Sequence, residues 1–376
     1  LLSTAGSALR LGDYDRAAAL YAAAARLDPK CEAAFAGQIE SLAQSGRHDE
    51  AETIFYLSQQ TIDDSAECLA AMAQSLIDRE DWDRAEWCLR ESLRISPNMP
   101  RLRGLLGKTY AAKDQPHRAI RMFLRELRDD PGNTEALLDY GDLLVDQRRY
   151  PEAAEKFRRV LELEPANLDA HLRLGELALT TGRHEQAQIE LELVLRLAPD
   201  LPGVRLMLAE ALLKRGNAAA AREHLADELR LIEDEGRVMP RTLASSGWDE
   251  SYLGSVLLDA DMPVDAALVF EREIRESSET VELLRKLAFA YFRAGDHDRA
   301  TAVSRRVLRL DPRNIESMHN LALSALETGR TRIALAWIAR GLKTSPRDED
   351  LRRLRIRALT AVVTDWLRRL FGARRG

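Results

Sequence analysis

An alanine recurs along the chain at an almost constant interval, and this interval constrains the fold more than any other feature. From Ala17 to Ala221 the interval is 34 residues, a single step of 45 then leads to Ala266, and 34-residue steps resume to Ala334. The ten positions are Ala17, Ala51, Ala85, Ala119, Ala153, Ala187, Ala221, Ala266, Ala300 and Ala334. A fixed period of this length indicates tandem copies of one supersecondary unit, each packed on its neighbours.

Three further columns keep the same register. A small residue lies twelve positions before the alanine, as in Ala73, Gly107, Gly141, Gly175, Ala209, Gly254, Ala288 and Ala322. A bulky residue lies four positions after it, as in Tyr21, Phe55, Leu89, Phe123, Phe157, Leu191, Leu225 and Phe270. Proline closes most copies, at Pro29, Pro97, Pro131, Pro165, Pro199, Pro312 and Pro346. Small and bulky residues so spaced let two antiparallel helices pack closely, and proline cannot continue a helix. Each copy is therefore predicted to be helix A, a short turn, helix B and a proline-marked turn.

These columns resemble the tetratricopeptide repeat family over nearly the whole chain. The resemblance implies an all-α fold, a right-handed α-solenoid or superhelix of tandem antiparallel helix pairs, closed by a C-terminal capping helix. We expect ten repeats, seven in residues 1–235 (the first truncated) and three in residues 247–348. Residues 236–246 are an irregular insertion and a predicted hinge, and residues 349–376 are expected to form the capping helix and a basic amphipathic tail. After the first, the repeats begin near Glu32, Ala66, Pro100, Thr134, Leu168, Pro202, Gly247, Val281 and Ile315.

A histidine stands beside an acidic residue at three of the predicted turns between helices A and B. The segments are GRHDEA at 46–51, GRHEQA at 182–187 and GDHDRA at 295–300. An isolated pair such as His184 and Glu185 could transfer a proton or hold half of a metal site. The three segments occupy one slot of different repeats, so they lie along the edge of a solenoid and do not converge. We interpret them as turns, with no catalytic or metal-binding role.

Enzyme motifs are absent from the sequence. It contains no phosphate-binding glycine loop, H-E-x-x-H, G-x-S-x-G or metal-spaced cysteine or histidine cluster, and its three cysteines do not form a disulfide framework. A solenoid also seldom encloses the dry pocket that catalysis needs. We therefore predict a protein that is not an enzyme and has no cofactor or metal. No apolar run is long enough to cross a membrane, and a cytoplasmic location is expected.

The resemblance places partner binding on the concave face, which the A helices line. One stretch of groove positions is acidic, with two cations: Glu135, Asp139, Asp142, Asp146, Asp169, Arg173, Glu176, Glu210 and Lys214. A second stretch is aromatic and basic: Trp248, Tyr252, Arg285, Lys286, Phe289, Phe292, Arg293 and Asn320. Aromatic and arginine side chains are enriched where binding energy concentrates, so the second stretch is the favoured contact surface. The alternatives are that Trp248 and Tyr252 pack on the insertion and that the acidic stretch is an ordinary solvated surface.

One function known in the family can be checked by residue. Members that dock chaperones hold a terminal carboxylate with a clamp of lysine, asparagine and arginine side chains. Arg285 and Asn320 fit two clamp positions, whereas Phe289, Asp350 and Leu354 stand where polar or basic residues are expected. The clamp is incomplete, and we therefore exclude docking of a chaperone C-terminus.

The C-terminal segment differs in charge from the rest of the chain. Residues 351–376 contain eight arginines and one aspartate, a net charge of +7, which leaves −13 in the other 350 residues. Apolar residues at helical spacing predict a helix that covers the last core face. The alternative is that the tail, with Trp366, Arg368, Arg369 and Phe371, lies on an anionic membrane surface or docks on an acidic partner, including a second copy.

These features favour a non-catalytic scaffold or adaptor that binds a protein, a peptide or a partner helix in its groove. It is expected to be a monomer, with self-association as an alternative. A membrane-targeting subunit that uses the basic tail is a second hypothesis. Nucleic-acid binding is disfavoured by the net charge of −6. The chain could also be the repeat region of a larger enzyme such as a glycosyltransferase, since it does not begin with methionine.

The predicted hinge gives a first test. Because each repeat packs only on its neighbours, opening at the insertion leaves both flanking arrays folded. Limited proteolysis should therefore cut first between Gly236 and Ser246, giving two resistant fragments on a gel. Uniform resistance across this segment would count against a hinge.

Overall fold

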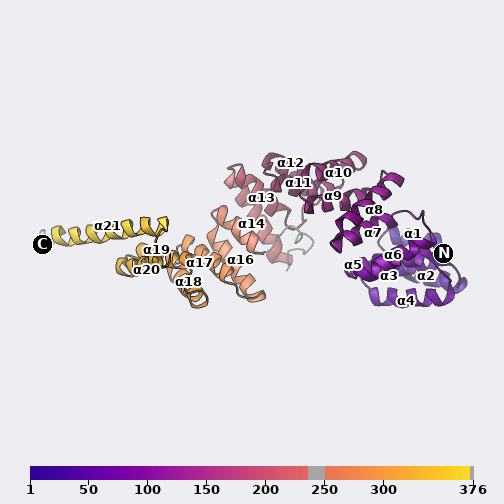
Figure 1. The fold of residues 1–376 in the computed structure, drawn as a ribbon, viewed down its shortest axis with the longest axis horizontal. Helices are drawn as coiled ribbons and strands as arrows, with labels where there is room; N and C mark the ends of the chain where they lie inside the picture. Colours follow the sequence, from indigo (N-terminus) through magenta and orange to yellow (C-terminus); the bar gives the residue numbers. More distant parts are fainter. Residues whose placement is uncertain (236–249, 373–376) are drawn as a thin grey trace. The chain divides into compact units, whose positions relative to one another are not determined.

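The computed structural model describes residues 1–235 and 250–372, and among these it leaves the side chains of 233–235, 250 and 365–372 undescribed. The described residues form twenty-one α-helices and no strand (Figure 1). This confirms the predicted all-α helical-repeat solenoid. The predicted hinge at 236–246 and Trp248 lie outside the described residues.

Helices A and B alternate along the chain. The A helices are α1 (Leu2–Arg10), α3 (Glu32–Gln44), α5 (Ala66–Asp78), α7 (Leu102–Ala112), α9 (Thr134–Asp146), α11 (Leu168–Thr180), α13 (Val204–Lys214), α15 (Glu250–Asp259), α17 (Val281–Arg293) and α19 (Ile315–Glu327). The B helices are α2 (Tyr14–Leu27), α4 (His48–Thr61), α6 (Trp82–Ile95), α8 (Pro116–Asp129), α10 (Tyr150–Leu163), α12 (His184–Leu197), α14 (Ala218–Glu235), α16 (Pro263–Glu276), α18 (His297–Leu310) and α20 (Thr331–Thr344). A last helix, α21, spans Glu349–Gly372.

The chain divides into two compact units, Leu1–Leu177 and Ala178–Gly376. In the first unit, buried side chains between Ala18 and Leu177 form one continuous cluster. At the end of the second unit, Ala322, Ile338 and Leu351 belong to a smaller cluster that joins α19, α20 and α21. The predicted domain boundary at 236–246 lies within the second unit and stays a prediction.

The sequence columns mark the contact between helices A and B. All ten alanines of the defining column are fully buried, and so are Phe123, Phe157 and Phe270 four positions after them. Phe157 packs so tightly on Gly141 that a Cβ atom at Gly141 would lie 2.3 Å from the phenylalanine ring. Gly107 with Phe123 and Gly254 with Phe270 repeat this geometry at 2.8 and 2.4 Å. A glycine is therefore required at these positions by close approach, as the spacing predicted.

Among the described residues, five A helices receive a short polar N-cap from their own preceding residue. The side chains of Ser65, Asn133 and Asn314, for example, accept hydrogen bonds from backbone N–H groups of the first turn. These bonds satisfy donors that have no partner within the helix.

Two A helices are capped instead by a buried glutamate from the B helix of the same repeat. Glu126 accepts hydrogen bonds from the backbone N–H of Arg101 at 2.9 Å and of Gly104 at 3.3 Å. Glu228 accepts one from the backbone N–H of Gly203 at 2.6 Å, and burial raises its pKa. In each repeat a bonded N–H group belongs to a proline turn, at 100–101 and at 202–203.

These proline turns shift two predicted helix starts. The repeats were expected to begin near Pro100 and Pro202, but α7 and α13 begin at Leu102 and Val204. The residue after each proline has a left-handed backbone, with φ of +67° at Arg101 and +84° at Gly203. A residue in that conformation cannot belong to a right-handed helix.

The turn from helix A to helix B uses one left-handed residue at a constant position, five before the column alanine. Six of these residues are glycine: Gly12, Gly46, Gly182, Gly216, Gly295 and Gly329. The other four are Glu80, Asp114, Arg148 and Asp261, with φ between +54° and +60°. Left-handed backbone is unfavourable for residues with a Cβ atom, so these four turns are strained relative to the six glycine turns.

Replacement of the exposed Arg148 by glycine should therefore stabilise the first unit. We expect Arg148→Gly to raise the free energy of unfolding by about 0.5–1 kcal/mol, since the relief of backbone strain exceeds the added chain entropy. Urea denaturation would measure it. The matched change in the opposite direction, Gly182→Ala, should lower the value by about 1 kcal/mol; equal effects of the two variants would contradict the argument.

Candidate binding surface

The acidic stretch of the first unit is a network of charges on three successive A helices. Arg173 on α11 donates to both carboxylate oxygens of Asp142 on α9, at 2.8 and 2.9 Å, and lies 3.4 Å from Asp169. Lys108 on α7 lies 3.9 Å from Asp139. Pairing thus runs from repeat to repeat along the face.

Burial raises the pKa of three carboxyl groups in this acidic stretch. It raises the pKa of Asp139 to about 6 and that of Glu176 to about 7, opposed in part by Lys108 and Arg173 respectively. Burial also raises the pKa of Asp146, with Asp142 adding repulsion. A carboxyl pKa raised in this way shows that nearby positive charge does not fully compensate the loss of solvent.

In the second unit, the basic side chains of the aromatic and basic stretch bind neighbouring A helices. Arg285 pairs with Glu316 on α19, and Lys286 donates to the hydroxyl of Ser251 on α15 at 2.6 Å. Both therefore join adjacent repeats. Arg293 binds Asp261 at 2.8 Å and lies 5.8 Å from the centre of the Phe289 ring.

The aromatic residues of this stretch have different environments. Phe289 is 39% exposed, whereas Phe292 is half-buried with its ring edge-on to His297. Tyr252 donates a hydrogen bond to Glu210 on α13, and burial followed by this bond raises the tyrosine pKa. Asn320 is buried. Phe289 is thus the aromatic side chain that the described part of this stretch offers to a partner.

A shallow pocket adjoins these residues. It has a volume of about 390 Å³ and is lined from α15, α16 and α17 by Ser251, Tyr252, Ser255, Glu273, Thr280, Glu282, Leu283 and Lys286. Its lining is mostly polar, with Lys286 and the two glutamates supplying charge.

Comparison with protein families identifies the repeat. Models described as "Tetratricopeptide repeat" match residues 2–66, 105–163, 138–202, 202–227 and 282–314, which together cover more than half of the chain. The chain belongs to the tetratricopeptide repeat family. No curated protein sequence matches it significantly.

Several solved tetratricopeptide and helical-repeat structures resemble the chain. A human IFIT1 dimer with m7Gppp-AAAA is 16% identical, with a TM-score of 0.54, over 85% of this chain and 72% of that one. PilW, a type IV pilus biogenesis factor, is 17% identical, with a TM-score of 0.50, over 55% and 94%. A tetratricopeptide repeat protein from Parabacteroides merdae is 18% identical, with a TM-score of 0.47, over 69% and 98%. At these identities the likeness concerns the fold alone.

Membership of the family makes the chain a protein-interaction scaffold in general terms, and tetratricopeptide regions are typically non-catalytic. Within residues 1–235 and 250–372 no group of three or more histidine, cysteine or acidic residues is arranged to hold a metal. Over the same residues, no helix combines the length and apolar character needed to span a bilayer.

One histidine of the tetratricopeptide turns has a structural contact that the sequence analysis did not anticipate. His48 Nδ1 lies 2.9 Å from the hydroxyl of Ser75, 27 residues later on the A helix of the next repeat. The same spacing relates His297 to Ser324, and both line one small cavity of about 30 Å³, but His297 Nδ1 and Ser324 Oγ are buried there without a hydrogen bond. The third turn has an alanine, Ala211, at the serine position. The recurrence of serine at this spacing was a signal available in the sequence.

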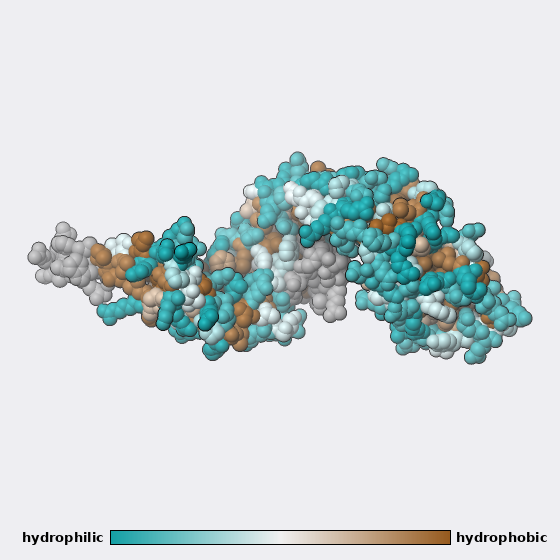
Figure 2. Space-filling model, viewed as in Figure 1, coloured by the Kyte–Doolittle hydropathy of each residue, from teal (hydrophilic) through white to brown (hydrophobic). Residues whose placement is uncertain are grey.

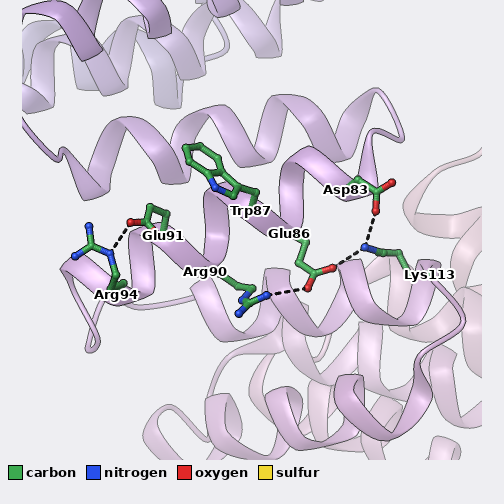
Figure 3. A pocket seen from close by; sticks show the side chains of 7 residues that line it. All are labelled: Asp83, Glu86, Trp87, Arg90, Glu91, Arg94 and Lys113. Atoms are coloured by element: carbon green, nitrogen blue, oxygen red, sulfur yellow. Dashed lines mark hydrogen bonds and ion pairs between the residues drawn. The ribbon is translucent and has the colours of Figure 1, made fainter.

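A second surface that the sequence analysis missed lies on helix α6. Trp87 is 58% exposed and forms one wall of a pocket of about 540 Å³ (Figure 3). Below it, Lys113 donates to Asp83 and Glu86, both at 2.6 Å, while Arg90 pairs with Glu86. The charges that line this pocket, from two successive tetratricopeptide repeats, are thus paired among themselves, and the indole is the exposed feature.

The remaining candidate residues keep the status of predictions. The side chains of Trp366, Arg368, Arg369 and Phe371 lie outside the described residues, as does Trp248. Of the two residues that fit the chaperone clamp, Arg285 is paired with Glu316 and Asn320 is buried.

The turn histidines provide a test of the tetratricopeptide repeat interface. His184 Nδ1 is buried without a hydrogen-bond partner, and Ala211 occupies the position of Ser75 and Ser324. We expect Ala211→Ser to supply that partner and to raise the free energy of unfolding by about 0.5–1.5 kcal/mol. Thermal denaturation would measure the change.

Two controls accompany this variant. Ser75→Ala should lower stability by a similar amount, since it removes the partner of His48. Ala209→Ser places the same hydroxyl on the same helix but against helix B, and should destabilise. Stabilisation by both alanine-to-serine changes would refute the pairing.

Proposed function

We propose that this scaffold binds an extended peptide along its A-helix face and that the acidic stretch on α9 and α11 selects a basic side chain. The observation that carries the proposal is a pair of half-buried carboxyl groups, Asp139 and Glu176, whose pKa values are raised to about 6 and about 7 by partial burial. They flank the ion pair between Asp142 and Arg173.

The electrostatics of these groups favour a cationic partner. A carboxylate that has lost solvent without gaining full compensation is stabilised by an added positive charge. A lysine or arginine of a partner would supply it and form charge-assisted hydrogen bonds. Because the acids lie on successive repeats, a peptide running along the face could place basic residues opposite more than one of them.

The aromatic and basic stretch of the second unit supports a second contact. Phe289 is exposed, and Arg293 lies over its ring, a combination enriched at interaction hot spots. We propose Phe289 as its apolar anchor, with Arg285, Lys286 and Arg293 setting charge, and with Tyr252, Phe292 and Asn320 as supporting residues.

A nucleic-acid ligand is the less favoured alternative. The similar human IFIT1 dimer is bound to m7Gppp-AAAA, but that likeness concerns the fold. The present chain has a net charge of −6, and its acidic A-helix face would repel a polyanion.

The proposal predicts binding that strengthens with pH. Asp139 and Glu176 must be ionised to hold a cation, and both deprotonate between about pH 5.5 and 7.5. We expect the full chain to bind a fluorescein-labelled peptide of alternating arginine and serine several-fold more tightly at pH 7.5 than at pH 5.5. Fluorescence anisotropy would measure this, and the Asp139→Asn, Glu176→Gln variant should lose about tenfold in affinity at pH 7.5 and the pH dependence with it.

A matched control separates the site from general charge. Glu155→Gln with Glu162→Gln removes the same charge from helix α10, on the B layer, and should change affinity less than twofold. Equal losses in the two variants would contradict a site.

Asp139 and Glu176 also affect the stability of the protein without ligand. Since burial raises their pKa, the folded state binds more protons than the unfolded one near pH 5–6. The free energy of unfolding should therefore fall as pH rises to 7.5, and Asp139→Asn should recover about 1–3 kcal/mol there.

A further inference from the structure

The C-terminal helix α21 occupies the place of helix A in a further repeat. It begins at Glu349, which is 34 residues after the start of α19 at Ile315, as α19 is after α17. Asp348 caps it by accepting from the backbone N–H of Leu351 at 2.9 Å, the role that Asn314 has in α19. Its inner face packs on α19 and α20 through Leu351, Leu354 and Ala358, which are buried. This inner face is the predicted cap.

Another face of α21 is bare and apolar. Ile356, Leu359, Val362 and Val363 are 68, 46, 40 and 54% exposed, and Figure 2 shows apolar residues gathered at this end of the chain. The residues 34 positions before Ile356 and Leu359 are Ala322 and Ala325, both buried. In α19 this face packs on the B helix, α20, whereas the described residues place nothing over it in α21.

The composition of the face argues against a regular repeat helix as its occupant. Ile356 stands in the column that holds glycine or alanine from Ala73 to Ala322, where Gly141 receives the Phe157 ring; Ile39, fully buried, is the branched exception near the start of the chain. Arg352 and Arg355, both exposed, replace the buried Met318 and Leu321 of α19. The face is thus apolar along one half and basic along the other.

Charge narrows the choice of occupant. The last 26 residues carry +7, so the ends of two copies would repel each other. The acidic stretch of a second copy is a poor acceptor as well, because it is a polar surface and the exposed face of α21 is largely aliphatic. A partner of this face of α21 must therefore present negatively charged groups next to an apolar layer that the aliphatic side chains can enter.

We propose that α21 docks on an anionic lipid surface. Ile356, Leu359, Val362 and Val363 would enter the boundary between headgroups and acyl chains, with Arg352 and Arg355 at the phosphates, as in interfacial amphipathic helices. This places the solenoid at a membrane without a spanning helix. It is independent of the peptide site, which lies on α9 and α11.

The test is co-sedimentation of the full chain with vesicles. We expect partitioning onto phosphatidylcholine vesicles with half phosphatidylglycerol to exceed that onto pure phosphatidylcholine by about tenfold, and to weaken at 0.5 M salt. The variant Ile356→Ser, Leu359→Ser, Val363→Ser should bind the anionic vesicles about tenfold more weakly. All three side chains are exposed, so circular dichroism should report an unchanged fold.

A control variant separates this face from general surface apolarity. Val264→Ser, Leu268→Ser, Ile333→Ser removes three similarly exposed aliphatic side chains from α16 and α20, and should change partitioning less than twofold. Three results would overturn the proposal. They are no binding to anionic vesicles, equal binding by the α21 and control variants, or a concentration-dependent dimer that only the α21 variant dissolves, which would assign the face to a second copy.

Discussion

The fold depends on the close approach of helices A and B at the column of small residues. Phe157 over Gly141 and Phe270 over Gly254 leave no room for a Cβ atom, and the column alanines beside them are fully buried. Because these contacts set the distance between the two helices of a repeat, they also determine where each A helix lies relative to the next. The position of every groove residue therefore follows from contacts made on the opposite side of its helix.

Local periodicity made the repeats predictable, and the exceptions are features that require knowledge of neighbours in space. The columns were sufficient for helix order, close contacts and turn positions. They did not show that Glu126 and Glu228 would cap α7 and α13, because each bond joins residues about 25 apart, from the start of helix A to helix B of the same repeat. Nor did they show that Arg148 would adopt the backbone of a turn glycine, since packing on both sides forces the conformation against local preference.

The sequence predicted the residue types of the candidate surface better than their burial, their pKa values or their exposure. The alternation of acids and Arg173 along the A helices was visible in the sequence, but the burial that raises the pKa of Asp139 required coordinates. The aromatic stretch shows the converse. Projection onto one face suggested several anchors, whereas Phe292 contacts its own turn and Phe289 alone among the described aromatics of the stretch is well exposed. The repeat periodicity thus predicts on which face of the solenoid a residue lies, but it does not predict how exposed the side chain is.

The two buried glutamate caps have a consequence for how the array opens. A helix capped by the serine or asparagine that precedes it forms its capping bond within its own first turn. In the repeats that contain Glu126 and Glu228, release of the first turn of helix A removes the backbone donors of a buried carboxylate on helix B, although Glu126 keeps a bond from the side-chain amide of Asn133. Fraying of one helix is thereby coupled to the other, and amide hydrogens at the start of α7 and α13 should exchange with those of α8 and α14 as single cooperative blocks.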